Sequence, residues 1–478
     1  MIVVGDRLRN LGTLTEDQAE RIHDESLRLL SSTGLRIQSK RARDVFASGG
    51  ASVKGEIVRL PPELVEHSID MCPKEVTLYA CNGEANPLGP GKMCHSTACH
   101  RLYVLDYGAR QYRRSATEDM SKLAGLAQAL PAIGAVSLMV SAAEYPAPIS
   151  EIKALEALVL YTDKHLYLAP QDLLEARVLL DLAEIVSDNR VPVPPVSLFA
   201  SATSPLTLGS EVADILFEGV QRGAVVTVGA CAAGGATGPV TLAGTVLLQN
   251  TETLCLLTLA QLIKPGTPVI YDSGSTIADL RTGTFSLGAV EYSLITDAAM
   301  ALANMYGLPF STTCGTNSPT IDVQNGLQKM LGYFTVMATG AGFSKNAGSL
   351  CNGTVMSLEQ LVLDHETILI SQRFFEGVRV DEESLAADLI ATIGPGGQYL
   401  TSRHTLQHCR SSERYVSPLL NMQQPNEPSL LERAHQTVER TLSDPTYTLD
   451  SSKQKEVRKY VRELTEQLGR MSESGETR

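Results

Sequence analysis

The chain has 478 residues, 43% of them hydrophobic, which is enough for a large buried core and more than one typical domain needs. Its 53 acidic residues outnumber its 40 Lys and Arg residues, and the resulting formal net charge of −13 disfavours nucleic acid as the main partner. Nine cysteines without regular spacing argue against a disulfide framework and fit a reducing compartment.

Nothing in the sequence predicts a membrane segment. The best candidate, residues 240–263, is interrupted by Gln249, Asn250 and Glu252. Residues 1–10 contain charged side chains and lack a long apolar core, so no signal peptide is predicted. We therefore expect a cytoplasmic protein with neither a membrane nor a nucleic acid as partner.

The N-terminal part of the chain predicts a small α/β head, residues 1–91. Thr15 and Gln18 form a capping-box pattern that opens a helix, and this helix ends near Thr33-Gly34. Short strands are predicted at 35–38, 55–60 and 75–79, with a helix over 61–71. The Gly/Pro-rich residues 86–91 end the head.

The middle of the chain, residues 92–393, alternates short strands with amphipathic helices. Eight strands are predicted, each followed by a helix, with the barrel proper starting at about residue 116: 135–140, 165–168, 196–200, 225–229, 268–271, 285–287, 309–313 and 341–344. Eight such repeats predict a (β/α)8 TIM barrel. A C-terminal extension, residues 394–478, has predicted helices over 432–442 and 453–468 and predicted disorder over 472–478.

Polar residues follow the predicted strands, at the edge where parallel α/β folds bind ligands. Glu291 follows the sixth predicted strand, and it would either face the barrel mouth or brace the next helix. Asn317 follows the seventh predicted strand, with Asp322 and Gln324 a little further along. These positions make all of them candidates for the binding site.

The Gly-rich segment 234–239 follows the fourth predicted strand and leaves two interpretations open. Its residues form a tight turn, or Gly235, Thr237 and Gly238 hold an anionic group of a ligand or cofactor at a helix N-terminus. The segment has neither the Lys of a P-loop nor the spacing of a dinucleotide fingerprint.

Two Cys-His pairs, Cys94-His95 and Cys99-His100, resemble a metal site, but no second cluster at ligand spacing supports one. We therefore predict no zinc. His404 is a better candidate for the pocket, because it follows a Gly-rich segment that could fold back over the barrel mouth.

Several motifs in one order carry a family resemblance. They are GATGPVTLAG at 235–244, DLRTG at 279–283, Glu291 leading to YGLP at 306–309, DVQ at 322–324, LEQLVLD at 358–364, and GGQYL at 396–400 followed by His404-Thr. Together they resemble the trimethylamine methyltransferase superfamily of corrinoid-dependent methyltransferases. The resemblance implies a TIM barrel that binds a methylated amine. It also implies a separate corrinoid-binding protein, whose Co(I) receives the methyl group at the barrel mouth.

One difference from the family pattern indicates which branch of the family the chain resembles. The true trimethylamine enzymes carry pyrrolysine in the cavity, whereas residues 314–324 here are all standard amino acids. The chain therefore resembles the branch without pyrrolysine, whose members demethylate glycine betaine and other quaternary amines. A quaternary ammonium loses a neutral tertiary amine and needs no proton donor, so its enzyme mainly positions the substrate and excludes water.

A trimethylammonium group is held by aromatic faces and carboxylates. The candidates near predicted strand ends are Tyr103, Tyr271, Tyr292 and Phe343, with the carboxylates Asp272 and Glu291. A substrate carboxylate would be received by Arg281, by His404 or by the helix N-terminus at Thr237 and Gly238. No residue is assigned to the chemical step.

Two other classes of function compete with this hypothesis. One is a barrel lyase or hydrolase that uses Glu291 or Asp322 as acid or base and needs no corrinoid partner. The other is a non-catalytic sensor of methylated amines. The identity of the amine and the oligomeric state stay open at this point, and a homo-oligomer is one of the options.

Overall fold

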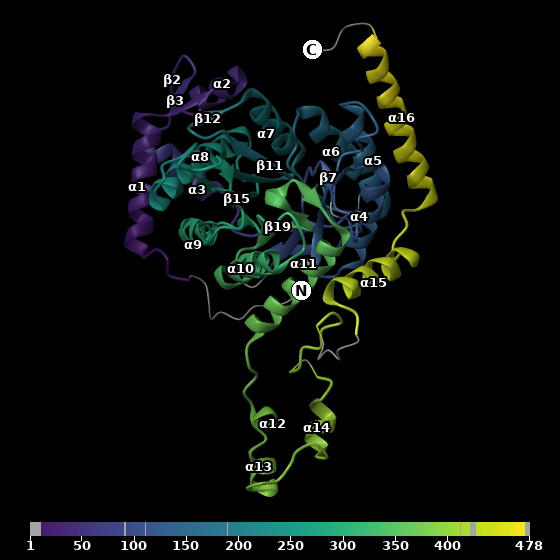
Figure 1. Ribbon diagram of the computed structural model, residues 1–478. Coiled ribbons are helices and arrows are strands. Elements are labelled where there is room, and N and C mark those ends of the chain that lie inside the picture. Colours follow the sequence, from purple (N-terminus) through teal and green to yellow (C-terminus); the bar gives the residue numbers. More distant parts are fainter. Residues whose placement is uncertain are drawn as a thin grey trace.

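The computed structural model describes residues 11–89, 92–109, 111–188, 190–411, 413–420 and 427–473. Parallel strands close into an eight-stranded barrel (Figure 1): β6 (Cys94–Thr97), β9 (Ile133–Ser137), β10 (His165–Leu168), β11 (Val196–Ala202), β13 (Val225–Ala230), β15 (Val269–Ser273), β18 (Phe310–Thr313) and β19 (Phe343–Ala347). The predicted TIM barrel is confirmed.

Each barrel strand is followed by a helix of the outer layer: α4 (Thr117–Ala129), α5 (Ile149–Tyr161), α6 (Leu173–Ser187), α7 (Ser210–Arg222), α8 (Leu242–Ile263), α9 (Val290–Met305), α10 (Val323–Thr339) and α11 (Leu358–Glu376). Side chains alternate along each strand, so one set meets these helices and the other fills the barrel. On β15, for example, Tyr271 points outward to α8 and donates a hydrogen bond of 2.9 Å to Asn250.

One predicted barrel strand was wrong, and one barrel strand was missed. The barrel starts with β6, well before residue 116, and β6 was missed because its sequence Cys-His-Ser-Thr carries almost no hydrophobic signal. The predicted strand 285–287 lies outside the barrel. There β17 (Thr284–Phe285) pairs antiparallel with β16 (Thr276–Asp279), which also pairs with β14 (Ala233–Gly234), in a small separate sheet.

The head packs on the barrel and closes its amino-terminal end. Its helices α1 (Glu16–Ser32), α2 (Lys40–Ser48) and α3 (Pro62–Met71) all contact α8. The predicted capping box at Thr15 and Gln18 is confirmed. The hairpin β4 (Val76–Tyr79)–β5 (Ala85–Leu88) packs Val76, Leu78 and Leu88 against the barrel interior at Cys94 and Phe343.

Two small sheets flank these parts. One joins β1 (Leu35–Ile37), β2 (Ser52–Lys54) and β3 (Ile57–Arg59) of the head to β12 (Thr207–Leu208). The other joins β7 (Tyr103–Val104), β8 (Arg113–Arg114), β20 (Ser349–Leu350) and β21 (Val355–Met356), which follow β6 and β19 at the mouth. Helix α8 is long and apolar enough to cross a membrane, and 83% of its apolar window is buried inside the fold.

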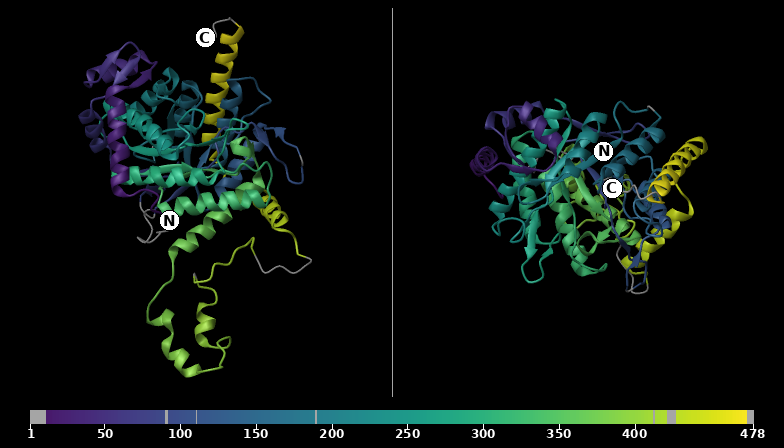
Figure 2. Two further views of the ribbon diagram at one scale, coloured as in Figure 1. Left: turned by 60° about the vertical axis from the view of Figure 1, so that its left-hand side comes forward. Right: turned by 90° about the horizontal axis from the view of Figure 1, so that it is seen from above.

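Beyond α11 the chain leaves the barrel as an arm that carries α12 (Glu382–Leu385), α13 (Ala387–Ile393) and α14 (Arg403–His408). Figures 1 and 2 show this arm projecting away from the rest of the molecule. The chain then returns as α15 (Leu430–Ser443), on α11 and α4, and α16 (Ser451–Glu473), on α5 and α6. Both C-terminal helices were predicted. The predictions for residues 1–10 and, in large part, for 472–478 fall outside the described residues.

Candidate functional site

An ion pair lies inside the barrel near the carboxyl ends of its strands, which form the mouth. Asp272 on β15 accepts a hydrogen bond from the ammonium group of Lys345 on β19, and both side chains are buried. The second carboxylate oxygen of Asp272 is buried without a hydrogen-bond partner among the described residues. A buried charged oxygen without a partner is costly, which points to a polar or cationic ligand or to water at this position.

Hydroxyl groups line the same interior. Ser96, Thr227 and Ser311 belong to three different barrel strands, and each has a buried side-chain oxygen without a hydrogen-bond partner among the described residues. A barrel core of this size is ordinarily filled with branched apolar residues. The polar lining therefore indicates a barrel interior built to receive a polar ligand.

Two aromatic rings complete this interior. The Lys345 ammonium group lies 4.5 Å from the ring centre of Phe199 and 5.8 Å from that of Tyr167. Burial raises the pKa of Tyr167 well above its ordinary value, and the neighbouring Asp272, Cys99 and Cys231 raise it further. Tyr167 is therefore a neutral phenol amid the charged groups of the mouth. Neither aromatic residue was a sequence candidate, because each looked like ordinary strand core.

Arg101 brings a positive charge to the mouth that no carboxylate of the described residues pairs with. Its guanidinium group donates a hydrogen bond to the side-chain oxygen of Asn346, while its Nε is buried without a partner. Burial lowers the pKa of Arg101 to about 10, with Cys99 and Tyr167 acting in the opposite direction. Among the described residues no carboxylate pairs with this half-buried guanidinium group, although arginines removed from water are normally paired. An anionic ligand group would provide the missing partner.

Next to Arg101 in the chain, Cys99 and His100 interact with each other. His100 has a left-handed backbone conformation (φ 58°), and its Nε2 lies 2.9 Å from Glu175 Oε1. Burial alone would raise the pKa of Cys99, but His100, Ser137 and the backbone of Ala169 lower it below the ordinary value. Burial would lower the pKa of His100, but Cys99 and Glu175 raise it well above its ordinary value. Each group of the pair therefore favours the charged form of the other.

Alkylation tests this charge state. Because its pKa is lowered, Cys99 should react with iodoacetamide at pH values below ~8.5, where an ordinary thiol is mostly protonated. The His100→Asn substitution removes the imidazolium and should shift the pH profile of Cys99 upward. Peptide mass spectrometry follows each cysteine separately, and the buried Cys255 and Cys314 serve as unreactive controls. A Cys99 profile with its midpoint at or above the ordinary thiol value would contradict the assignment.

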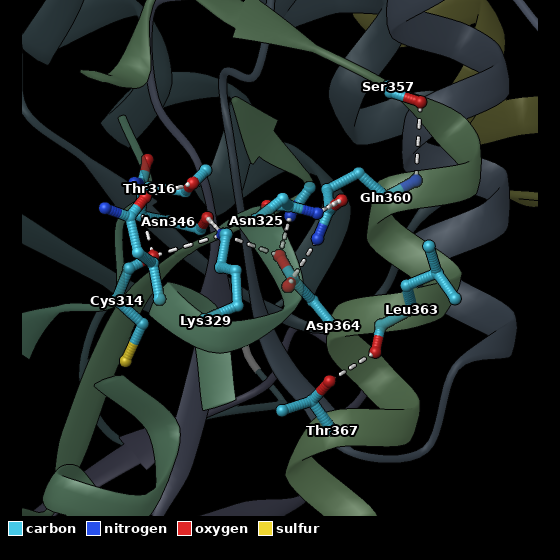
Figure 3. Close-up of polar contacts among 12 residues, drawn as sticks. Cys314, Thr316, Asn325, Lys329, Asn346, Ser357, Gln360, Leu363, Asp364 and Thr367 are labelled. Carbon is cyan, nitrogen blue, oxygen red and sulfur yellow. Dashed lines mark hydrogen bonds and ion pairs between the residues drawn. The ribbon is translucent and has the colours of Figure 1, made fainter. Parts of the chain in front are cut away.

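The strand ends at the mouth are held by a second buried ion pair, drawn in Figure 3. The Lys329 ammonium group on α10 donates to Asp364 of α11 at 2.8 Å and to the backbone oxygens of Cys314 and Asn346 at 3.1 Å. Burial raises the pKa of Asp364, whereas Lys329 and the Gly348 amide act in the opposite direction. This network fixes Asn346, and Asn346 in turn holds the guanidinium group of Arg101.

The predicted aromatic candidates lie in different parts of the structure. Phe343 faces the barrel interior below the ion pair, its ring 5.3 Å from that of Tyr167. Tyr271 points outward to α8, and the Tyr292 hydroxyl is buried near Thr312 and Thr313 at the end of β18. Tyr103 lies on β7, partly exposed beyond the barrel.

Most of the predicted polar candidates lie away from the interior. Arg281 is exposed and pairs with Asp279, whereas His404 lies on the arm. Asn317 accepts a hydrogen bond from the Gly288 amide and donates one to Ser286, both at the mouth rim. The exposed Gln324 lies in the first turn of α10.

The Gly-rich segment 234–239 is a tight turn. The amides of Gly235, Thr237 and Gly238 all donate to backbone oxygens within the segment or at Ala233. The turn needs glycine at Gly235, whose φ is 90°, and at Gly234, where a side chain would lie 2.9 Å from the Thr245 hydroxyl. Helix α8 begins later, at Leu242. With those amides already used, the turn interpretation is favoured over anion binding.

The side chains of Cys94 and His95 point to opposite sides of β6. Cys94 faces the barrel interior, while the His95 Nδ1 lies 2.7 Å from the Ser344 hydroxyl. Within the described part of the chain, no group of three or more His, Cys, Asp and Glu side chains is arranged to hold a metal ion. The absence of zinc stays a prediction.

Glu291 lies in the first turn of α9, partly exposed. A carboxylate there interacts favourably with the helix dipole, so we expect Glu291→Gln to destabilise the fold by about 0.3–1 kcal/mol. Asp272→Asn should instead weaken amine binding, because it removes the charge inside the barrel. Calorimetric titration and melting curves on both variants separate the two roles. A larger loss of amine affinity for Glu291→Gln than for Asp272→Asn would contradict this assignment.

Comparison with known proteins identifies the family. A family profile described as trimethylamine methyltransferase (MTTB) matches residues 2–469. The chain belongs to the trimethylamine methyltransferase family. It is 32% identical to the glycine betaine methyltransferase of Desulfitobacterium hafniense (strain Y51), over 87% of this chain and 88% of that protein. It is 27% identical to the trimethylamine methyltransferase MttB of D. hafniense (strain DSM 10664 / DCB-2), over 84% and 83%.

A solved structure of the same fold agrees with this assignment. The Methanosarcina barkeri monomethylamine methyltransferase matches with a TM-score of 0.52 at 12% identity, over 91% of this chain and 92% of that one. At this identity the match supports the barrel fold alone. Family membership makes the chain a methyltransferase of the methylamine type, as the motifs had indicated.

Proposed function

We propose that this protein transfers a methyl group from a betaine-like quaternary amine, one that also carries a carboxylate, to the Co(I) of a corrinoid bound to a partner protein. The observation that carries the proposal is Arg101, a half-buried guanidinium group with a buried Nε and no carboxylate partner among the described residues, beside Tyr167. The similarity to a glycine betaine methyltransferase supports the same substrate class.

In this proposal the two ends of the substrate meet opposite charges. Arg101 receives the carboxylate in place of Arg281 and His404, which lie too far from the interior. The free oxygen of Asp272 and the rings of Phe199 and Tyr167 receive the trimethylammonium group. Phe343 forms the apolar wall beneath Tyr167. A zwitterion bound in this way brings no net charge into the barrel, which limits the cost of burial.

The proposed reaction requires no proton transfer by the side chains of the barrel. The N–C bond to one methyl group breaks, the electron pair stays on nitrogen, and a neutral tertiary amine leaves. The corrinoid acts as the methyl acceptor and supplies the nucleophilic electron pair. The side chains orient the N–CH3 bond toward the mouth and exclude water from it. The standard amino acids of the interior suffice, since no amine has to be activated first.

The test uses free cob(I)alamin with glycine betaine, other betaines, choline and trimethylamine. We expect methylation with carboxylate-bearing quaternary amines, seen as the change in absorbance from cob(I)alamin to methylcobalamin. Turnover with trimethylamine and none with any quaternary amine would refute the proposal. A lyase or hydrolase would consume the substrate without cobalamin, and a sensor would bind betaine and transfer nothing. Asp322 gives the lyase little support, because it is an exposed N-cap of α10.

A further inference from the structure

The arm, residues 377–418, is folded without a core of its own. None of its described residues is buried, although it contains three helices of four, seven and six residues. Helices this short do not persist alone in water, because their few hydrogen bonds do not offset the cost of ordering the backbone. The arm therefore needs an external surface to support it.

The arm exposes many apolar side chains. Leu400 and Leu406 are 79% and 76% exposed. The further exposed apolar residues of the arm are Val378, Val380, Leu385, Ile390, Tyr399 and Val416. Its charged residues partly neutralise one another, since Arg379 pairs with Asp381 and Glu383. An arm of this composition fits an apolar surface better than a charged one.

The outer layer of the barrel offers such a surface, which we call the α9–α10 face. On α10, Val323 and Leu327 are 80% and 70% exposed, and Leu331 continues their row at helical spacing. On the adjoining α9, the exposed apolar residues are Val290, Leu294 and Met305. At Met305 the face meets a groove of about 570 Å³ lined by Met300, Ala301 and Leu308.

The arm does not cover this face in its own chain, because it points away from the barrel (Figures 1 and 2). The direction of α11 disfavours the corrinoid protein as the partner of the arm. This helix of 19 residues begins near Gly348 at the mouth and is about 28 Å long, so its last residue lies near the opposite end of the barrel. The arm thus starts far from the opening that a methyl acceptor must approach.

We propose that two copies of this chain form a two-fold symmetric dimer in which the arm of each copy packs on the α9–α10 face of the other. A self-complementary exchange covers both arms and both faces at once. The root of the arm supports this geometry. There Phe374 is exposed next to Phe334 of α10, with ring centres 5.1 Å apart, so the arm begins at the edge of the face.

Light scattering coupled to gel filtration tests the proposal. The wild-type protein should run as a dimer. The arm variant Leu400→Glu/Leu406→Glu and the face variant Val323→Glu/Leu327→Glu should both run as monomers. Val240→Glu, at an exposed apolar position on neither surface, is the matched control and should stay dimeric. Circular dichroism and methylation of free cob(I)alamin should be unchanged in all variants, which separates loss of the dimer from unfolding.

Mixing the two monomeric variants gives a sharper result. The face variant keeps an intact arm and the arm variant keeps an intact face, so an equimolar mixture restores one of the two contacts and should form mixed dimers at higher concentration. Mixing either variant with itself restores none. A wild-type monomer, dimers that survive both pairs of substitutions, or a mixture that stays monomeric would overturn the proposal. Loss of transfer to a corrinoid protein without loss of the dimer would assign the arm to the methyl acceptor instead.

Discussion

Replacing Arg101 by Met should weaken glycine betaine binding by about 2–4 kcal/mol, which is a factor of roughly 30 to 1,000. The substitution keeps most of the apolar stem and removes the charge that we assign to the substrate carboxylate. Choline has the same trimethylammonium group and no carboxylate, so its affinity should change little. Arg101→Lys should recover part of the loss, because it restores the charge without the planar fork. Calorimetric titration of both ligands measures the difference.

Stability separates this binding role from a structural one. Removing a half-buried guanidinium group that lacks a carboxylate partner should leave the midpoint of unfolding unchanged or raise it. Equal losses of affinity for betaine and choline, or a large drop in the midpoint, would show that Arg101 supports the fold rather than the ligand.

Replacing Lys329 by Met should destabilise the protein by about 3–5 kcal/mol. The substitution leaves the fully buried Asp364 without its cation, and it removes the donor that joins the ends of β18 and β19. The midpoint of chemical unfolding measures the effect. The double variant Lys329→Met/Asp364→Leu removes the stranded charge as well and should recover much of the loss.

The Lys329→Met substitution should also weaken ligand binding indirectly. Since Lys329 fixes the backbone of Asn346, and Asn346 holds Arg101, the surviving folded protein should bind betaine more weakly than wild type. A midpoint unchanged in Lys329→Met would contradict the structural role of this ion pair.

The barrel could be predicted because its outer layer obeys simple rules. Strands such as β10 and β13 and amphipathic helices such as α9 follow the hydrophobic period of their element. β6 could not be found in this way. Its Ser96 lines a polar interior and its His95 bonds to Ser344, so this buried strand has polar side chains where a hydrophobic pattern would be expected. The segment at Phe285 misled in the opposite way. It is apolar enough to predict a barrel strand, but it lies in the small separate sheet at the mouth.

The site was harder to predict than the fold because strand register decides which residues face inward. Asp272 was named as a candidate and faces the interior, whereas its neighbour Tyr271 faces α8. Arg101, Tyr167 and Phe199 were missed. The sequence signal at Arg101 was the Cys99-His100 pair directly before it, which had been weighed as a metal site and set aside. Once β6 is known to be a barrel strand, Arg101, which follows it, is placed at the mouth.

The most direct test of the account uses glycine betaine with three deuterated N-methyl groups, cob(I)alamin and the purified protein under anaerobic conditions. Mass spectrometry should find trideuteromethylcobalamin and dimethylglycine with two labelled methyl groups in equal amounts, formed only when the protein is present. Formation of dimethylglycine without labelled cobalamin, or no reaction with betaine while trimethylamine is demethylated, would contradict the account.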